Sequence, residues 1–273
     1  MDELKLKAFL EKNHQEIPGW FFPLDQLVFF ELFVAQLSMR IEGDLCEIGV
    51  FRGKSFVLMS LLRSASERLV GFDLFADEDE AETIQNLSKY GDPQDTGLIK
   101  GLTSSHSMDD LDALITAPVR FLHVDAGHEY HEVLEQLHLF SPYVAEQGII
   151  AMDDYQDREF PGIEAAVLDF ADLDRPRRFV PFLAGGNKIF LCCSPMAIAF
   201  QKFLLDRPNF RDTCRLTRVR DFNVLILRSK LPVSSRQIVD QLDSLNFPRR
   251  PEATTSLNQK SSKFSQVTFG SGL

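Results

Sequence analysis

Three acidic residues and one histidine follow two apolar runs in the middle of the chain. The first run ends at Asp125 and the second at the pair Asp153 and Asp154, while His128 lies three residues after Asp125. Carboxylates are preferred ligands of hard divalent cations, and a histidine can take up a proton near neutral pH. If these four side chains meet, they form a site suited to proton transfer on a bound ligand.

The pattern of the stretch 121–155 explains why these side chains should meet. It reads as a short apolar run, an amphipathic segment of helical length and a second apolar run. This order is typical of a strand–helix–strand unit with parallel strands. Parallel strands end on the same side of a sheet, where open α/β sheets bind their ligands. The stretch therefore predicts a site at the carboxyl edge of a sheet.

A second pattern lies upstream, where another strand-like run ends in a glycine turn. Glu47, Gly49 and Gly53 stand as ExGxxxG, and a helical segment begins at Ser55. Such a turn lets a ligand approach the backbone closely and meets it with free N–H groups. A dinucleotide fingerprint has glycine where Glu47 stands, so a bound pyrophosphate and an NAD-dependent oxidoreductase are disfavoured.

Asp73 lies near the carboxyl end of the next strand-like run, 68–75, about 20 residues after Gly53. An acidic residue at this place in a strand–helix–strand unit can accept hydrogen bonds from both ribose hydroxyls. Alone, it would be interpreted as a cap or turn residue. Together with the glycine turn, it favours a nucleoside site.

The remaining segments predict a doubly wound, mostly parallel α/β sheet with an antiparallel edge hairpin over 178–193, joined at Gly185 and Gly186. Four parts are expected: an N-terminal helical segment packed on the core (1–42), the main domain (43–230), a C-terminal helix (231–246) and a disordered tail (247–273). The apolar spacing over 23–39 predicts a helix on the sheet edge. Two segments allow more than one interpretation. The aromatic stretch 17–22 could be a hydrophobic plug, a substrate-contacting lid or a dimer contact. The acidic stretch 75–95 could be a solvated face or a mobile lid.

Composition restricts the class of partner. The 273 residues carry a formal net charge of −11, which argues against a general binder of nucleic-acid phosphates. The four cysteines show no CxxC spacing, the N-terminal residues lack an apolar secretory core, and the run 27–37 is too short to span a bilayer. We expect a reduced, cytoplasmic protein with no membrane or nucleic-acid partner; homo-oligomerisation is left open.

Together, these motifs resemble the class I methyltransferases that use S-adenosylmethionine. CEIGVFRGKS is similar to their first motif and VGFD to their second. HVDAGHEYHEVLEQL, followed by GIIAMDDYQDREFPGIEAAV, resembles the branch of metal-dependent sugar O-methyltransferases of the macrocin and mycinamicin type, which has a relative described as a cephalosporin hydroxylase. The resemblance covers roughly 17–193 and implies a Rossmann-like fold with a seven-stranded sheet.

The resemblance also implies a role for each matching position. Glu47, Gly49, Gly53 and Ser55 would line the methionine end of the cofactor, and Asp73 would hold its ribose. The chain departs from the family after the third strand, where GLTSSHS stands in place of an acidic residue, so the adenine contacts are left open.

On the acceptor side, the resemblance assigns Asp125, Asp153 and Asp154 to a divalent metal and His128 to the general base. Mg²⁺ suits three carboxylates and could bind an acceptor hydroxyl, lowering its pKa. We therefore expect a methyltransferase that uses S-adenosylmethionine and Mg²⁺ and acts on a hydroxyl of a small molecule, such as a sugar or a glycosylated natural product. The alternative is a cofactor-binding, non-methylating component of a hydroxylase-type biosynthetic system.

Overall fold

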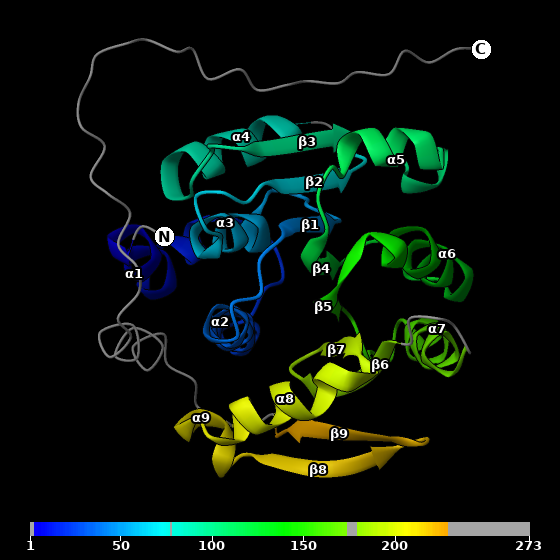
Figure 1. The fold of residues 1–273 in the computed structure, drawn as a ribbon. Coiled ribbons are helices and arrows are strands. Elements are labelled where there is room, and N and C mark those ends of the chain that lie inside the picture. The colour runs from blue at the N-terminus through cyan, green and yellow to red at the C-terminus, as the bar shows by residue number, and fades with distance from the viewer. Residues whose placement is uncertain (1–2, 77, 174–178, 229–273) are drawn as a thin grey trace.

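The computed structural model describes residues 3–76, 78–173 and 179–228. A central sheet lies between two groups of helices (Figure 1), and each face of the sheet is covered by its own hydrophobic cluster. The predicted C-terminal helix (231–246) and tail (247–273) lie outside the described residues.

The sheet has the strand order β3-β2-β1-β4-β5-β7-β6-β9-β8. Its strands are β1 (Asp44–Ile48), β2 (Leu69–Asp73), β3 (Thr96–Lys100), β4 (Val119–Val124), β5 (Val144–Met152), β6 (Phe179–Gly185), β7 (Lys188–Cys193), β8 (Cys214–Val219) and β9 (Phe222–Leu227). β1 to β5 pair in parallel, β7 runs antiparallel between β5 and β6, and β8 runs antiparallel to β9. This confirms the Rossmann-like, mostly parallel fold with antiparallel strands on one side.

Two details of the predicted sheet were wrong. The described residues form nine strands rather than seven, and the predicted edge hairpin, β6–β7, is followed by β9 and β8 on its outer side. The sequence CRLTRV of β8 is polar and largely exposed, as is common for an edge strand. Its apolar signal is consequently too weak to be recognised from the sequence.

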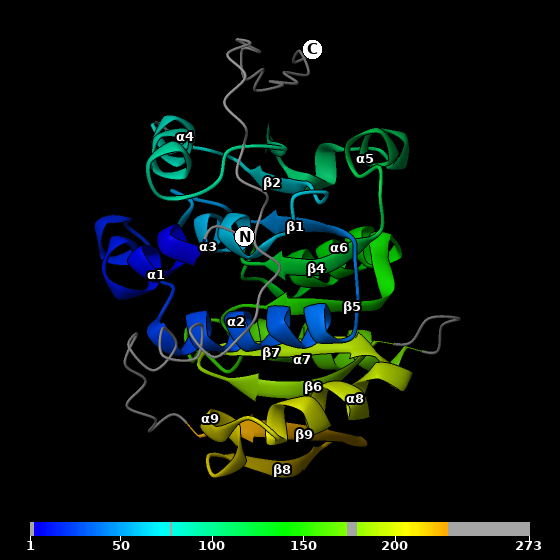
Figure 2. The ribbon, with the colours of Figure 1, turned by 60° about the vertical axis from the view of Figure 1, so that its left-hand side comes forward.

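The helices divide between the two faces of the sheet (Figures 1 and 2). On one face lie α1 (Glu3–Glu11), α2 (Pro23–Ser38), α3 (Lys54–Leu62), α4 (Asp79–Tyr90), α8 (Ser194–Leu205) and α9 (Pro208–Arg211). On the other lie α5 (Met108–Leu114), α6 (Tyr130–Phe140) and α7 (Pro161–Asp172). Short 3-10 turns occupy Asn13–Glu16, Thr103–Ser105 and Ser141–Tyr143.

The acidic stretch 75–95 contains helix α4. Asp79 and Glu82 lie in its first turn, where negative charge is favourable, and both pair with Arg52. Leu87 is buried, and the opposite side of the helix is in solvent.

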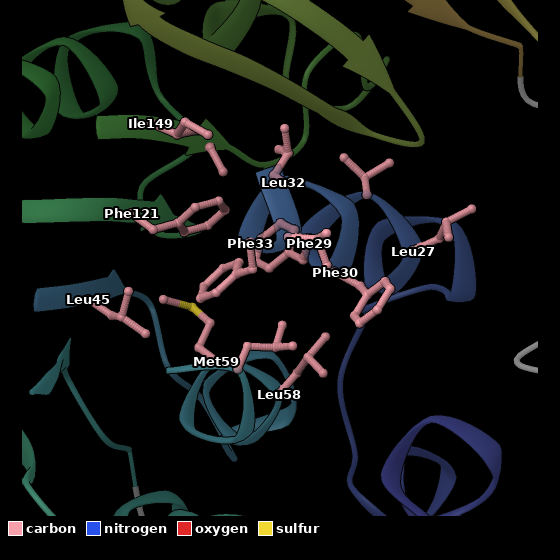
Figure 3. Close-up of a cluster of buried hydrophobic side chains, with 14 of the residues drawn as sticks. Leu27, Phe29, Phe30, Leu32, Phe33, Leu45, Leu58, Met59, Phe121 and Ile149 are labelled. Atoms are coloured by element: carbon pink, nitrogen blue, oxygen red, sulfur yellow. The ribbon is translucent and has the colours of Figure 1, made fainter. Parts of the chain in front are cut away.

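Helix α2 packs across a face of the sheet, and its predicted place on the sheet edge was wrong. Its residues from Asp25 to Gln36 are all buried, as expected for a helix that is apolar on nearly all sides. Phe29 packs edge-on against Phe121 of β4 with ring centroids 5.0 Å apart, and Phe33 lies 4.7 Å from the same ring (Figure 3). This packing fixes the segment that precedes α2.

The N-terminus of α2 carries a buried carboxylate. Asp25 Oδ2 accepts a hydrogen bond from the Phe22 N–H at 3.1 Å, whereas Oδ1 has no hydrogen-bond partner among the described residues. Burial raises the pKa of Asp25 to about 6, and the ammonium of Lys188 offsets part of that rise.

Among the described residues, no helix combines the length and the apolar character needed to cross a bilayer.

The raised pKa of Asp25 predicts a pH-dependent effect of Asp25→Asn. The wild-type carboxylate must ionise inside the protein as pH rises through about 6, so the folded state loses stability that it has below the ordinary pKa. Asparagine does not ionise. From pH 4 to pH 8, the free energy of unfolding of the variant should rise relative to wild type by roughly 3 kcal/mol.

Urea unfolding at several pH values measures this difference. Asp221→Asn is the control for the substitution itself, because that side chain is 89% exposed. A constant difference between Asp25→Asn and wild type would contradict the assignment.

Candidate active site

A cavity of about 850 Å³ opens at the carboxyl ends of β1, β2, β4 and β5. Asp125, His128, Asp153 and Asp154 all line it. The structure thus brings the four residues together, because β4 and β5 are parallel neighbours in the sheet. The loop after β1 and the segment 18–22 line the same cavity.

The backbone of the glycine turn after β1 lies very close to the backbone at the end of β4. Gly49 has φ +87°, and a Cβ atom on it would lie 1.9 Å from the carbonyl oxygen of Asp125. Gly53 also has positive φ, at +81°, and begins helix α3. The turn therefore rests directly on the end of β4 and places the cofactor motif beside the acidic group.

Asp73 anchors this turn. Its Oδ2 accepts hydrogen bonds from the N–H groups of Val50 at 2.7 Å and Phe51 at 2.8 Å, and its Oδ1 accepts one from Phe75 at 2.6 Å. The carboxylate also lines the cavity, where a ribose could share it. The ribose role stays a prediction, and the structure adds a second role in shaping the loop.

Glu47 lies beneath the cavity, fully buried, while Ser55 lines it. One oxygen, Oε1, accepts a hydrogen bond from Ser55 Oγ at 2.5 Å and lies 2.6 Å from His123 Nδ1. Ser55 thus connects Glu47 to the cavity, and the place of Glu47 at the methionine end of the cofactor stays a prediction.

His123, which lies within strand β4, also contacts the acidic group. It is the register partner of Glu47 on β1, and its Nε2 lies 3.9 Å from Asp153 Oδ2. Ligand atoms of His123, Asp125 and Asp153 all lie within 4.8 Å of one another. The strand register, which the sequence alone does not provide, reveals this group.

Lys188 is a second residue that sequence reasoning missed. Its buried ammonium pairs with Asp153 Oδ2. Burial by itself would raise the pKa of Asp153, but Lys188 and then His123 hold it below its ordinary value. Burial raises the pKa of Asp125 well above its usual range, and the charge of Asp153 adds to that rise.

His128 is oriented by two neighbours. Its Nε2 lies 3.2 Å from Asp154 Oδ2, and its ring stacks on Phe160 with centroids 4.1 Å apart. Asn187 donates a hydrogen bond to Asp154 Oδ1 at 3.1 Å. Burial, followed by the charge of Asp153, raises the pKa of Asp154. A histidine oriented by a carboxylate is the arrangement of a general base.

The donor set fits a hard divalent cation. Asp125 and Asp153 supply oxygen atoms that lie close together, and Asp154 lines the same cavity. The raised pKa values of Asp125 and Asp154 reflect burial and repulsion that a cation would relieve. Lys188 and His128 each contact one of the oxygens, and His123 offers a further ligand atom. Asp125 and Asp153 therefore lie at the centre of the candidate metal site.

The cavity has exposed apolar walls where β2 and β3 end. Leu74 after β2 and Leu102 after β3 are more than half exposed and line the cavity beside Gly101, Thr103 and Ser104. A flat apolar ring fits between such walls.

Comparison with known proteins agrees with this arrangement. Residues 46–155 match a family model described as a methyltransferase domain. The chain contains a methyltransferase domain. The match begins in β1, takes in the glycine turn and Asp73, and ends just after the Asp153–Asp154 pair.

Solved structures share the fold of this methyltransferase domain. CalS11, a TDP-rhamnose 3'-O-methyltransferase of calicheamicin biosynthesis, is 19% identical with a TM-score of 0.51, over 62% of this chain and 79% of that one. TomG from Streptomyces achromogenes, an O-methyltransferase of tomaymycin synthesis, is 16% identical with a TM-score of 0.52, over 69% and 90%. A Bacillus cereus O-methyltransferase in complex with SAH has the same identity and TM-score, over 69% and 89%.

An uncharacterized protein of Acanthamoeba polyphaga mimivirus is 31% identical over 131 residues. The matched region spans 44% of this chain and 56% of that relative.

The close approach at Gly49 predicts a large effect of Gly49→Ala. The added Cβ would collide with the backbone of β4 in a conformation that alanine rarely adopts, so the free energy of unfolding should fall by about 3 kcal/mol or more. Gly97→Ala is the control, because no atom of the described residues lies within 4 Å of its Cβ position, and it should change stability by less than about 1 kcal/mol. Equal stabilities of the two variants in urea unfolding would show that the turn does not rest on β4.

Proposed function

We propose that the chain is an S-adenosylmethionine-dependent O-methyltransferase that acts on a hydroxyl of a small molecule, such as a sugar or a glycosylated natural product. One observation carries the proposal. A single cavity is lined both by the glycine turn with Asp73 and by the carboxylates with His128. A donor and an acceptor bound there would lie side by side, which is the main requirement of a direct displacement.

The cofactor half of the proposal rests on the ends of β1, β2 and β3. Ser55 and the turn at Gly49 would face the methionine end, Asp73 the ribose, and Leu74 with Leu102 the adenine. The hydrogen bonds from Val50 and Phe51 to Asp73 keep the turn in shape before any ligand arrives. Such preorganisation lowers the cost of binding.

The acceptor half rests on the His128–Asp154 pair. With Asp154 at Nε2, the Nδ1 atom of His128 is the ring nitrogen that can take the hydroxyl proton. Asp154 then stabilises the imidazolium that forms, and stacking on Phe160 keeps the ring in place. Bound S-adenosylmethionine would supply the methyl group, and Mg²⁺ would supply a Lewis acid for the acceptor oxygen.

We propose Asp125, Asp153 and Asp154 as the residues that hold the Mg²⁺, with His123 beside them. The support is the oxygen-rich donor set and the surplus of negative charge around Asp153. Lys188 would keep Asp153 ionised and thus ready to bind a cation.

The acceptor class is suggested by the relatives of known activity. CalS11 is described as acting on TDP-rhamnose, and TomG as taking part in tomaymycin synthesis. Because these proteins share only the fold with this chain, a role in natural-product biosynthesis and a cytoplasmic location stay predictions. A cofactor-binding component without transfer activity is the competing function.

Replacing His128 tests the base. His128→Ala should lower kcat by about 10²- to 10⁴-fold, because the acceptor proton loses its recipient. Binding of S-adenosylmethionine, measured by calorimetry, should not change. His131→Ala is the matched control on the exposed side of α6. Unchanged turnover of His128→Ala would show that another group takes the proton.

Metal binding predicts a stability difference that needs no turnover. Mg²⁺ at a hundredfold excess over its Kd should stabilise the wild type by about 2.7 kcal/mol. Asp125→Asn should remove that response without lowering stability in EDTA, because burial and the charge of Asp153 already oppose ionisation of Asp125. Asp221→Asn should keep the full response. An identical Tm with Mg²⁺ and with EDTA in the wild type would contradict the metal site.

A further inference from the structure

The cavity carries an aromatic surface that neither the base nor the metal uses. Trp20 is 76% exposed, Phe22 is 52% exposed and Phe51 is partly exposed, and all three line the cavity. Large apolar side chains exposed together in a concave site usually mark a place where a ligand binds.

The backbone around Trp20 is held firmly. Lys54 Nζ donates a hydrogen bond to the Gly19 carbonyl at 2.9 Å, and Gln26 Nε2 donates one to the Phe21 carbonyl at 3.2 Å. The Phe21 ring points inward, where it packs on Phe29 with centroids 5.0 Å apart. The anchors on both sides of Trp20 fix its backbone while its indole stays exposed.

The Trp20 ring is also supported from one side. It stacks on Phe51 with ring centroids 6.1 Å apart and an interplanar angle of 27°. Phe51 belongs to the glycine turn, and its N–H is bound by Asp73. The indole is therefore a platform joined to the cofactor turn, and most of its surface is available to a second molecule.

The chemistry of the cavity indicates what that molecule is. An indole surface binds flat or ring-shaped apolar faces, while the carboxylates and His128 in the same cavity bind hydroxyls. A cavity of about 850 Å³ admits small molecules and not a folded partner. A ring that carries hydroxyls on its edge and presents an apolar face can contact both the indole and the carboxylates with His128.

Building on the proposed O-methyl transfer, we propose that Trp20 determines acceptor specificity by stacking on a six-membered ring that bears the reacting hydroxyl. The ring is that of a pyranose or a phenol. Linear diols, which offer the same hydroxyls without a face to stack, bind weakly.

Trp20 is the only tryptophan in the chain, so its fluorescence reports directly on this surface. Methyl α-L-rhamnopyranoside, catechol and 2,3-butanediol are titrated into the wild-type protein saturated with S-adenosylhomocysteine and Mg²⁺. A saturable change with one or both ring probes and none with the linear diol is expected. The two ring probes distinguish a sugar from a phenol, and a flat signal with both overturns the proposal.

Substitution of Trp20 tests its role in acceptor binding separately from the methyl-transfer step. Trp20→Ala should raise the KM for the ring acceptor about tenfold, with little change in kcat, while Trp20→Phe should retain most of the affinity. Ile198→Ala on α8 is the control, because that side chain is equally exposed and lies outside the cavity lining. An unchanged KM in Trp20→Ala overturns the platform and leaves the methyltransferase proposal intact.

If the wild type transfers no methyl group, calorimetry with the same ring probes decides the platform independently. Weaker binding to Trp20→Ala than to wild type supports it, and equal binding overturns it. Analytical sedimentation tests whether the aromatic segment 17–22 is instead a dimer contact. A wild-type dimer that dissociates in Trp20→Ala makes Trp20 an interface residue and overturns the proposal.

Discussion

The pairing of β5 with β7 is the constraint on which the acidic site depends. It brings Lys188 and Asn187, at the start of β7, to the Asp153–Asp154 pair at the end of β5. The Tyr155 N–H donates to the Asn187 carbonyl at 2.7 Å, which ties the two ends together. Lys188 compensates the charge of Asp153, and Asn187 holds Asp154. A buried carboxylate without such a partner would be protonated or would destabilise the fold.

The β5–β7 pairing also determines how the outer residues of the site are held. Asp154, once held by Asn187, holds His128, and Phe160 closes over the imidazole. Asp153 connects inward to His123, which in turn contacts Glu47 below the glycine turn. The glycine turn and the acidic group thus lie on either side of one buried polar cluster. Because these buried contacts lie under the cavity, they can hold the loops after β1, β4 and β5 in place while the outer atoms of those loops contact a ligand.

Strand ends were predictable from the sequence because apolar runs are a strong signal. Asp125, Asp153, Asp154 and His128 were therefore expected together, and the structure brings them together. Lys188 and His123 were not expected, because one depends on an antiparallel neighbour and the other on strand register. Strand β8 was missed because its exposed, polar sequence carries little apolar signal. The contacts between residues on neighbouring strands could not be predicted, because each strand was recognised from its own segment of the sequence.

Transfer of an isotopically labelled methyl group from S-adenosylmethionine to a panel of hydroxylated small molecules, followed by mass spectrometry, tests whether this protein methylates a hydroxyl. We expect an O-methylated product from at least one acceptor and unlabelled S-adenosylhomocysteine in equal amount. Tight cofactor binding with no product from any acceptor would contradict it, and would favour a cofactor-binding component that does not transfer methyl groups.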